Sequence, residues 1–422
     1  MSLPRLLIVL ISTLTAAPAL AADHVTLSGK VVDDAGKPVD HATVLIYHAG
    51  VKQGYSTFCP SCYVDCGKRA ITNLDGTFTI QGVDSDLLFQ LLAVRDRFQP
   101  AFVNHVDPLA PIGPAAVLTP KTKTPLPSNM VRGHVVDDQG RPLRDAVVQP
   151  EGISTTTLPN GKPSKDEVSM YGTIKGLEPV AITDGKGDFE ISHDKGALGM
   201  MLLFEARGFA PKLQALSTGV ERTTVSVSQG AAVRGRLIDH GQPVAGAEIG
   251  LIARNRGGFG GHLTIIGNPY DEIRVGTQAD GSFVLADVPS PVEWYVYAKM
   301  ESVSQRGATE PVPCATRSAG EVVDVGDLHI QPGHRLRGQI VLSDGAKIPP
   351  GMRVTIASDR AFDSQTMLIQ PDGSFAYAGL PTGAYEIFAS VRGYRAANAI
   401  GKLSIDHDVD DFKLMLERDI QP

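Results

Sequence analysis

The sequence predicts an all-β protein made of four tandem β-sandwich domains, and three observations support this fold class. A glycine-led segment of alternating apolar residues begins at Gly29, Gly133, Gly235 and Gly338, at intervals of 104, 102 and 103 residues. In each copy a second signature follows, in which a tight turn precedes a phenylalanine. No long stretch places apolar residues at the 3.6-residue spacing of an amphipathic helix, so we expect very little helix.

The glycine-led segment reads as a strand that enters a turn. In the first copy it is Gly29-Lys-Val-Val-Asp-Asp-Ala-Gly-Lys-Pro38, and a second apolar run follows it. Glycine supplies a positive φ within the turn, and proline fixes φ directly after it. We therefore expect a β-hairpin in each copy. The fourth copy, Gly338 to Val354, follows the pattern more loosely.

The second signature is Leu74-Asp-Gly-Thr-Phe78 in the first copy and has counterparts in the other three. Asp-Gly between alternating apolar residues is a strong short hairpin signal. A calcium loop needs several acids at alternate positions, whereas each turn here has one or two, so we expect tight hairpin turns that hold no metal. The phenylalanines that follow the turns are expected in the cores; they are Phe78, Phe189, Phe283 and Phe375.

A third element recurs in three copies and is missing from one. It reads Ala93 to Phe98 in the first copy, Ala206 to Phe209 in the second and Ser390 to Tyr394 in the fourth. The third copy departs from it, with Tyr297-Ala-Lys-Met300 at the corresponding place.

Together these segments resemble the carboxypeptidase regulatory-like domain family. Its members are similar to transthyretin, a seven-stranded Greek-key β-sandwich, and are often grouped with carbohydrate-binding-like folds. The resemblance covers nearly the whole chain after residue 21. It implies carbohydrate or protein binding without choosing between them, because one fold hosts many functions.

Surface-adhesin repeats of the B type are a second tandem sandwich family, and they form Lys–Asn isopeptide bonds from a lysine in the first strand. Lys30 occupies that place in the first copy. The equivalents in the other copies are His134, Arg236 and Gln339. Isopeptide chemistry is therefore not a property of this repeat.

The first 21 residues read as a signal peptide. Arg5 precedes the apolar run Leu6 to Ile11, and Ala19-Leu20-Ala21 fits the small-residue rule for cleavage. The run is short for a membrane span, and Pro18 interrupts it. We expect an exported protein, periplasmic or secreted, with no membrane span after removal of the signal.

The repeat spacing predicts the domain bounds 22–118, 129–229, 231–331 and 333–422 after a signal peptide at 1–21. The segment Thr119–Pro127 is rich in proline and threonine and reads as an extended linker. The connections within the first three units differ: Gly50–Lys68, Gly152–Gly176 and Arg254–Ile273. Variable loops on a constant framework are where sandwich proteins present binding groups.

Charge and motif content exclude several functions. The formal net charge is −7 and the basic residues are scattered, which argues against nucleic acid or an anionic membrane surface as partner. The chain has no Gly-x-Ser-x-Gly elbow, P-loop or dinucleotide fingerprint, and its 11 histidines do not cluster. We expect no enzyme activity, no cofactor and no metal. The oligomeric state is left open.

The most unusual stretch is Cys59-Pro-Ser-Cys62-Tyr-Val-Asp-Cys66. In an exported protein such cysteines usually form disulfides, and Cys314 is available for the third thiol. A redox Cys-x-x-Cys normally sits at a helix N-terminus, whereas these flanks are loop-like. Thiolates also suit zinc or Cu(I), with His48 as the nearest further ligand. We favour at least one disulfide among Cys59, Cys62 and Cys66, and keep thiol-redox or metal-handling chemistry as the alternative function.

Aromatic side chains on loops are the candidates for sugar or protein contacts, and their packing onto the sandwich is the competing interpretation. They are Tyr55, Phe58 and Tyr63 in the first insertion, and Phe259 and Tyr270 in the third. The sequence therefore predicts an exported, non-enzymatic binding or scaffolding protein of the cell envelope, whose partner is a carbohydrate or an envelope protein.

Overall fold

The computed structural model describes residues 24–419 apart from the segments 53–62, 64, 122–126, 156–166, 169–173, 175, 195–196, 255–272, 360–362 and 397–400. Its strands form eight sheets, which pair face to face into four β-sandwiches. We call the sandwiches unit one to unit four in chain order. The prediction of an all-β chain of four tandem sandwiches is confirmed.

Units one and two follow the same plan. In unit one, one sheet has β4 (Thr77–Asp84), β1 (His24–Asp33) and β7 (Ala115–Leu118), and the other has β3 (Arg69–Ile71), β2 (Thr43–Val51), β5 (Leu87–Val94) and β6 (Ala101–Val106). After the short 3-10 helix η1 (Pro127–Asn129), unit two has β12 (Asp188–Ser192), β8 (Met130–Asp137) and β15 (Thr223–Val227) in one sheet. Its second sheet has β10 (Glu167–Val168), β9 (Val147–Ser154), β13 (Gly199–Glu205) and β14 (Lys212–Ser217), with β11 (Ala181–Ile182) paired to β9.

Units three and four follow the same plan as units one and two. In unit three, β16 (Ala231–Asp239) pairs with β17 (Gln242–Pro243), β20 (Ser282–Val288) and β23 (Val322–His329), opposite β19 (Ile273–Gly276), β18 (Glu248–Ala253), β21 (Val292–Ala298) and β22 (Val312–Thr316). The helix α2 (Met300–Val303) follows β21. In unit four, the sheet β27 (Ser374–Leu380), β24 (His334–Leu342), β31 (Val409–Arg418) and β29 (Tyr394–Ala396) faces the sheet β26 (Ser364–Leu368), β25 (Arg353–Ser358), β28 (Gly383–Ser390) and β30 (Gly401–Ile405).

The same pairing defines every unit. The glycine-led strand is antiparallel to the strand that follows the Asp-Gly or Lys-Gly turn, as β1 is to β4. It is parallel to the last strand of the unit, as β1 is to β7. The chain therefore returns to its starting strand before it leaves a unit, which closes each sandwich as a compact body.

The hairpin prediction was right about the turns, is met by a two-residue strand in unit three, and was wrong about the long strands that follow. The turn glycines of the first signature do have positive φ, for example 79° at Gly36, and Val39 N–H bonds back to the Val31 carbonyl at 3.0 Å. The next strand, however, joins the opposite sheet: β1 and β2 never pair. The Asp-Gly turns likewise connect strands of opposite sheets, such as β3 and β4. In unit three the first signature does form a short hairpin, because β17 pairs antiparallel with β16 before the chain crosses to β18 in the opposite sheet.

The aspartates of these turns bond to their own turn. Asp75 Oδ1 accepts from Thr77 N at 3.0 Å and from Thr77 Oγ1 at 2.7 Å, and Asp280 does the same with Ser282. These hydrogen bonds lower the pKa of both carboxyl groups. That local role accounts for the aspartates without a metal, and the absence of metal stays a prediction.

Each unit has its own apolar core, and the closing phenylalanines lie in these cores as predicted. All four are buried, each within the cluster of its own unit: Phe78, Phe189, Phe283 and Phe375. Within the part of the chain that is described, the helices are α2 and η1 alone, so the expectation of very little helix is confirmed there. The tail beyond Asp406 forms β31, a strand with alternating burial.

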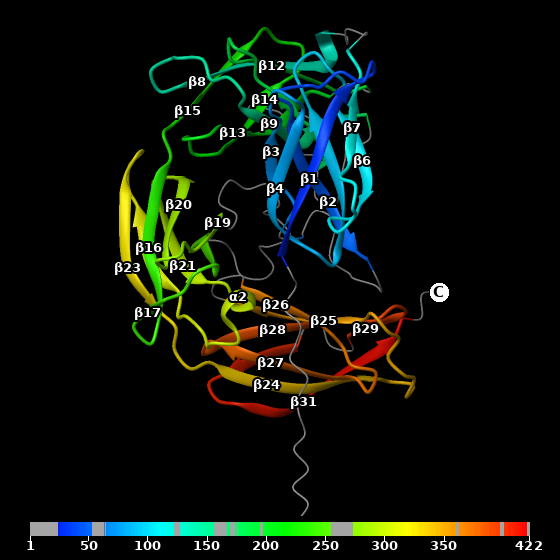
Figure 1. The fold of residues 1–422 in the computed structure, drawn as a ribbon, viewed down its shortest axis with the longest axis vertical. Coiled ribbons are helices and arrows are strands. Elements are labelled where there is room, and N and C mark those ends of the chain that lie inside the picture. Colours follow the sequence, from blue (N-terminus) through cyan, green and yellow to red (C-terminus); the bar gives the residue numbers. More distant parts are fainter. Residues whose placement is uncertain are drawn as a thin grey trace, which may run out of the picture.

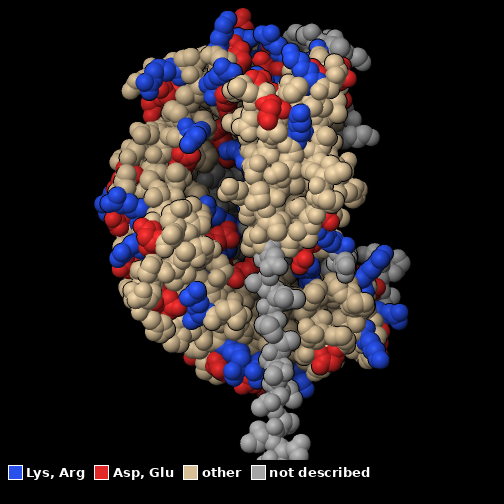
Figure 2. Space-filling model, viewed as in Figure 1, with Lys and Arg blue, Asp and Glu red and all other residues tan. Residues whose placement is uncertain are grey.

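The four units do not form a straight string. Figure 1 shows units one and two side by side at one end, unit three along one flank, and unit four across the other end. The lower end of unit one points toward α2 and unit four. The space-filling view shows charged side chains of both signs along the furrow between unit one and its neighbours, and no large patch of one sign on this face (Figure 2).

Candidate functional site

The helix α2 occupies the place where the third copy departs from the repeat. In the other units a tight turn fills this place, as where Phe98 N–H bonds to the Arg95 carbonyl at 3.1 Å. In unit three the chain instead turns into α2, whose first residue, Met300, is 1% exposed and lies in the apolar core of unit four. The helix therefore fastens unit three to unit four.

The N-terminus of α2 is capped by the next unit. Its own N-cap residue, Lys299, makes no side-chain cap. Instead the Met300 N–H donates to Asp363 Oδ2 at 2.7 Å, from the segment ahead of β26. Lys299 Nζ lies 3.3 Å from Asp363 Oδ1, and both side chains are 5% exposed. A carboxylate at a helix N-terminus is stabilised by the unpaired N–H groups there. Removing one partner of a buried ion pair is strongly destabilising, because the other charge stays buried.

A pocket of about 320 Å³ lies beside this contact, between units three and four. Unit three contributes Tyr297, Met300, Thr309 and Pro311, and unit four contributes Ser358, Asp359, Asp363 and residues 381–384. Its walls thus combine apolar surface with hydroxyl and carboxylate groups. Ligand pockets occur preferentially at domain interfaces.

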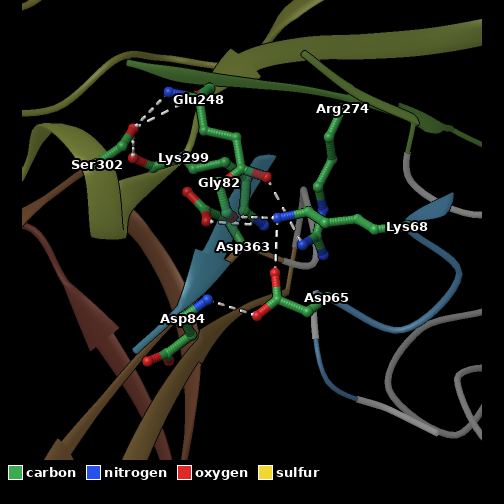
Figure 3. Close-up of polar contacts among 9 residues, drawn as sticks. All are labelled: Asp65, Lys68, Gly82, Asp84, Glu248, Arg274, Lys299, Ser302 and Asp363. Atoms are coloured by element: carbon green, nitrogen blue, oxygen red, sulfur yellow. Dashed lines mark hydrogen bonds and ion pairs between the residues drawn. The ribbon is translucent and has the colours of Figure 1, made fainter. Parts of the chain in front are cut away.

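Unit one brings a third set of polar groups to the same region. Lys68 Nζ bonds to Asp65 Oδ1 and to the Gly82 carbonyl, both at 2.6 Å, and the Asp84 N–H donates to Asp65 Oδ2 at 2.9 Å. Figure 3 shows these groups close to Lys299 and Asp363. In unit three, Arg274 lies 3.8 Å from Glu248, and the Glu248 N–H donates to Ser302 Oγ of α2 at 3.1 Å. We call this set the three-unit junction.

The junction changes the acidity of its carboxyl groups. Glu301 of α2 is exposed to solvent, and partial desolvation raises the pKa of its carboxyl group. Lys299 opposes that rise, and Asp84, Glu248 and Asp363 add to it. Desolvation and the nearby Asp65 and Asp86 also raise the pKa of Asp84.

Units one and two are joined by an apolar contact. Leu45, Leu92 and Val94 of unit one pack against Val147, Val180 and Ile182 of unit two. An exposed ion pair, Arg69 to Glu205 at 2.9 Å, lies beside them. Units two and three meet where the Gly208 N–H donates to Asp287 Oδ1 at 2.9 Å. Every successive pair of units therefore has a specific contact.

The cysteine predictions meet the structure only in part, because Cys59 and Cys62 lie outside the described residues. Cys66 is half-buried against the core of unit one, and burial raises the pKa of its thiol to about 12. Cys314, on β22, is a free thiol packed against the core of unit three, with its pKa raised to about 11. Reactive thiols have lowered pKa values, whereas burial acts in the opposite direction on these two thiols.

Cys66 packs against the core of unit one and Cys314 against the core of unit three. Pairing of the third thiol of the loop with Cys314 stays a prediction. A disulfide within the loop of unit one stays a prediction.

Of the predicted loop aromatics, one lies within the described residues and four lie outside them. Tyr63 is half-buried and packs against the core of unit one, as the packing interpretation predicts. Tyr55, Phe58, Phe259 and Tyr270 lie outside the described residues. Lys30 is exposed on the outer face of β1, which fits the exclusion of isopeptide chemistry.

Among the described residues no group of three or more histidine, cysteine, aspartate or glutamate side chains is arranged to hold a metal. No helix in the described part of the chain is long and apolar enough to cross a membrane.

The residues of the junction were not singled out from the sequence. Lys299, Glu301 and Asp363 belong to no motif, and Asp84 ends an ordinary strand. One signal did point to the region: the third copy loses its turn motif at Tyr297–Met300, where the pocket and α2 are found. A break in an otherwise regular repeat was thus the available clue.

No protein-family model matches the sequence, and no curated protein matches it. Among solved structures, the Bacillus anthracis TIE protein aligns at 9% identity over 96% of this chain and 76% of that one, with a TM-score of 0.18. A streptococcal ancillary pilin aligns at 10% over 69% and 99%, TM-score 0.22. The Streptococcus agalactiae minor pilin GBS52 aligns at 12% over 46% and 98%, TM-score 0.23. Scores this low identify neither a family nor a function.

Proposed function

We propose that this chain is an exported, non-catalytic binding or scaffolding protein of the cell envelope, periplasmic or secreted. Its four units are sandwiches of the carboxypeptidase regulatory-like, transthyretin-like type, with bounds at 22–118, 129–229, 231–331 and 333–422 after a signal peptide. The repeated signatures and the parallel pairing of first and last strands support this assignment.

The observation that carries the proposal is the pocket between units three and four. Its two sides come from different units, and α2 fixes them to each other through Met300 and Asp363. A site built across a fixed boundary needs little ordering when a ligand binds, which favours affinity. The hydroxyl and carboxylate groups of its wall suit a carbohydrate or a polar segment of an envelope protein.

The test is a binding screen of the exported protein against glycans, peptidoglycan fragments and envelope proteins. Ala384 lines the pocket and is exposed, so Ala384→Trp should fill the pocket without disturbing a core. Ala110 is exposed in unit one, far from the pocket in sequence, and Ala110→Trp is the matched control. Loss of a detected ligand with Ala384→Trp alone would support the site. Equal binding by both variants would place the ligand elsewhere.

A further inference from the structure

The outer face of the sheet β3–β2–β5–β6 in unit one extends beyond its contact with unit two. Leu45, Leu92 and Val94 of this face are covered by unit two. Phe102 of β6 pairs with Leu92 of β5 and is 38% exposed. The accessible part of the face therefore begins directly beside an established contact between two units.

A β-bulge in β2 places two neighbouring rings on this face. Ile46 and Ala49 both lie in the core of unit one, and the register of β2 with β5 shifts between Ile46 and His48. Side chains of a regular strand alternate between faces, so one residue would separate two core residues. Here Tyr47 and His48 both stand between them and point outward, as bulges re-aim side chains next to functional sites.

A second bulge, in β6, completes a polar row across three strands. His48 of β2 lies opposite Gln90 of β5, and Gln90 Nε2 donates to Asn104 Oδ1 of β6 at 2.6 Å. The register of β5 with β6 shifts here, so that Asn104 and His105 both lie opposite Gln90. Both are exposed, and His105 has a φ of 55°.

The aromatic rings lie beside this polar row and support one another. The Tyr47 and Phe102 ring centroids are 5.3 Å apart at an interplanar angle of 71°, and those of Tyr47 and His48 are 4.6 Å apart. Tyr47 also packs against the contact with unit two, which holds it in place. We call Tyr47, His48, Gln90, Phe102 and Asn104 the platform.

The platform is uncharged. The strands β2, β5 and β6 contain no aspartate, glutamate, lysine or arginine. Burial lowers the pKa of His48, which favours the neutral imidazole that can both donate and accept hydrogen bonds. The charged groups at the margins are paired, Lys52 with Asp107 at 2.5 Å and Arg69 with Glu205 at 2.9 Å.

We propose that the platform binds a neutral saccharide. A sugar ring has an apolar face that can stack on an aromatic ring, and hydroxyl groups that suit the amides and the imidazole. A protein partner usually covers about 800 Å² on each side. Phe102, however, is the one large apolar residue of β2, β5 and β6 that is exposed. The platform is separate from the pocket between units three and four and does not depend on its ligand.

Isothermal titration calorimetry of the exported protein with cellohexaose, maltohexaose and N-acetylchitohexaose tests the platform. We expect at least one of these neutral saccharides to bind. Phe102→Ala removes the exposed ring and should weaken that binding by about tenfold, because the sugar loses its apolar contact. Asn104→Ala keeps the rings and removes one amide, so it should weaken binding by about threefold to tenfold. Circular dichroism should stay unchanged in both variants.

Two variants serve as controls. Phe388 on β28 of unit four is 36% exposed, and Phe388→Ala should bind as the unaltered protein does. Ala384→Trp fills the pocket between units three and four and should also leave this binding unchanged, which separates the two sites. Failure of all three saccharides to bind would overturn the proposal. So would equal weakening by Phe102→Ala and Phe388→Ala. A dimer that Phe102→Ala dissociates, without saccharide binding, would show that the face pairs two copies instead.

Discussion

In each unit the ring of the closing phenylalanine lies over the Cα of the leading glycine. Gly29 and Phe78 face each other across β1 and β4, and the other three units repeat the pair. A Cβ placed on Gly29 would meet Phe78 Cζ at 2.5 Å and the Pro114 carbonyl oxygen at 2.6 Å. The glycine is thus required by a close approach, since its own φ is not positive.

This contact gives the first prediction. Gly29→Ala should destabilise unit one by about 1–3 kcal/mol, because neither the buried ring nor the backbone can move away. Gly50, on β2, has no atom within 4 Å of its Cβ position and no positive φ. Gly50→Ala should therefore stay within about 0.5 kcal/mol. Urea unfolding of both variants checks this, and equal losses would contradict it.

The second prediction at this scale concerns the thiol of Cys314. Its half-buried place on β22 and its raised pKa, about 11, leave little thiolate near neutral pH. Alkylation by iodoacetamide should be slow in the folded protein and fast in denaturant, because the thiolate is the reacting form. Mass spectrometry of the peptide that contains Cys314 measures both rates. Similar rates in the two states would show that the thiol is not protected.

At the scale of elements, the short helix α2 joins unit three to unit four, which the turn motif of the repeat does not do. The turn motif of units one, two and four connects strands within a unit, whereas α2 reaches into the core of unit four through Met300. Four residues do not make a stable helix by themselves. The hydrogen bond from the Met300 N–H to Asp363 and the burial of Met300 supply the stability that so short a helix lacks by itself.

The third prediction tests this cap. Asp363→Ala removes the acceptor of the Met300 N–H and leaves the Lys299 ammonium buried beside an alanine. Loss of one partner of a buried pair costs about 3–5 kcal/mol. Units three and four should then unfold in separate calorimetric transitions. Asp359→Ala, an exposed aspartate at the same pocket, is the control and should leave the calorimetric profile unchanged.

The fourth prediction concerns the loop of unit one. Close-set cysteines in an oxidising compartment favour at least one disulfide among Cys59, Cys62 and Cys66. Mass spectrometry of the exported protein, alkylated with and without reductant, should show a mass difference for this loop. All four cysteines reduced and metal-free would contradict the prediction.

At the scale of the molecule, the four units fold back on each other instead of extending. Unit one touches unit two through apolar side chains, and it approaches units three and four through charged ones. The two sides of unit one thus differ in the chemistry of their neighbours.

The fifth prediction tests the apolar contact between units one and two separately from the charged groups on the other side of unit one. Leu92 is completely buried in the contact with unit two, and Leu92→Asp places a charge there without a partner. Burying an unpaired charge is strongly unfavourable, so units one and two should separate at every pH. Val117, on β7, is 51% exposed, and Val117→Asp is the control. Scattering should show a larger radius for Leu92→Asp alone, with the β-type circular dichroism retained.

The sequence by itself determined what is local. Turn glycines such as Gly36 must have positive φ, and a phenylalanine after Asp-Gly must find a core, so these roles could be read from single segments. The fourfold spacing then gave the number of sandwiches. The sequence also indicated where the junction lies, because the third copy lacks the turn motif at Tyr297–Met300.

Only the tertiary structure decided what depends on partners far apart in the chain. The signatures look like hairpins, but β1 pairs with β4 and β7, because each strand buries its apolar face across a sandwich and not against its neighbour in sequence. Asp84, Lys299, Glu301 and Asp363 are ordinary polar residues in the sequence. They lie close together because three units converge on α2, where the Lys299 and Asp363 side chains are withdrawn from water.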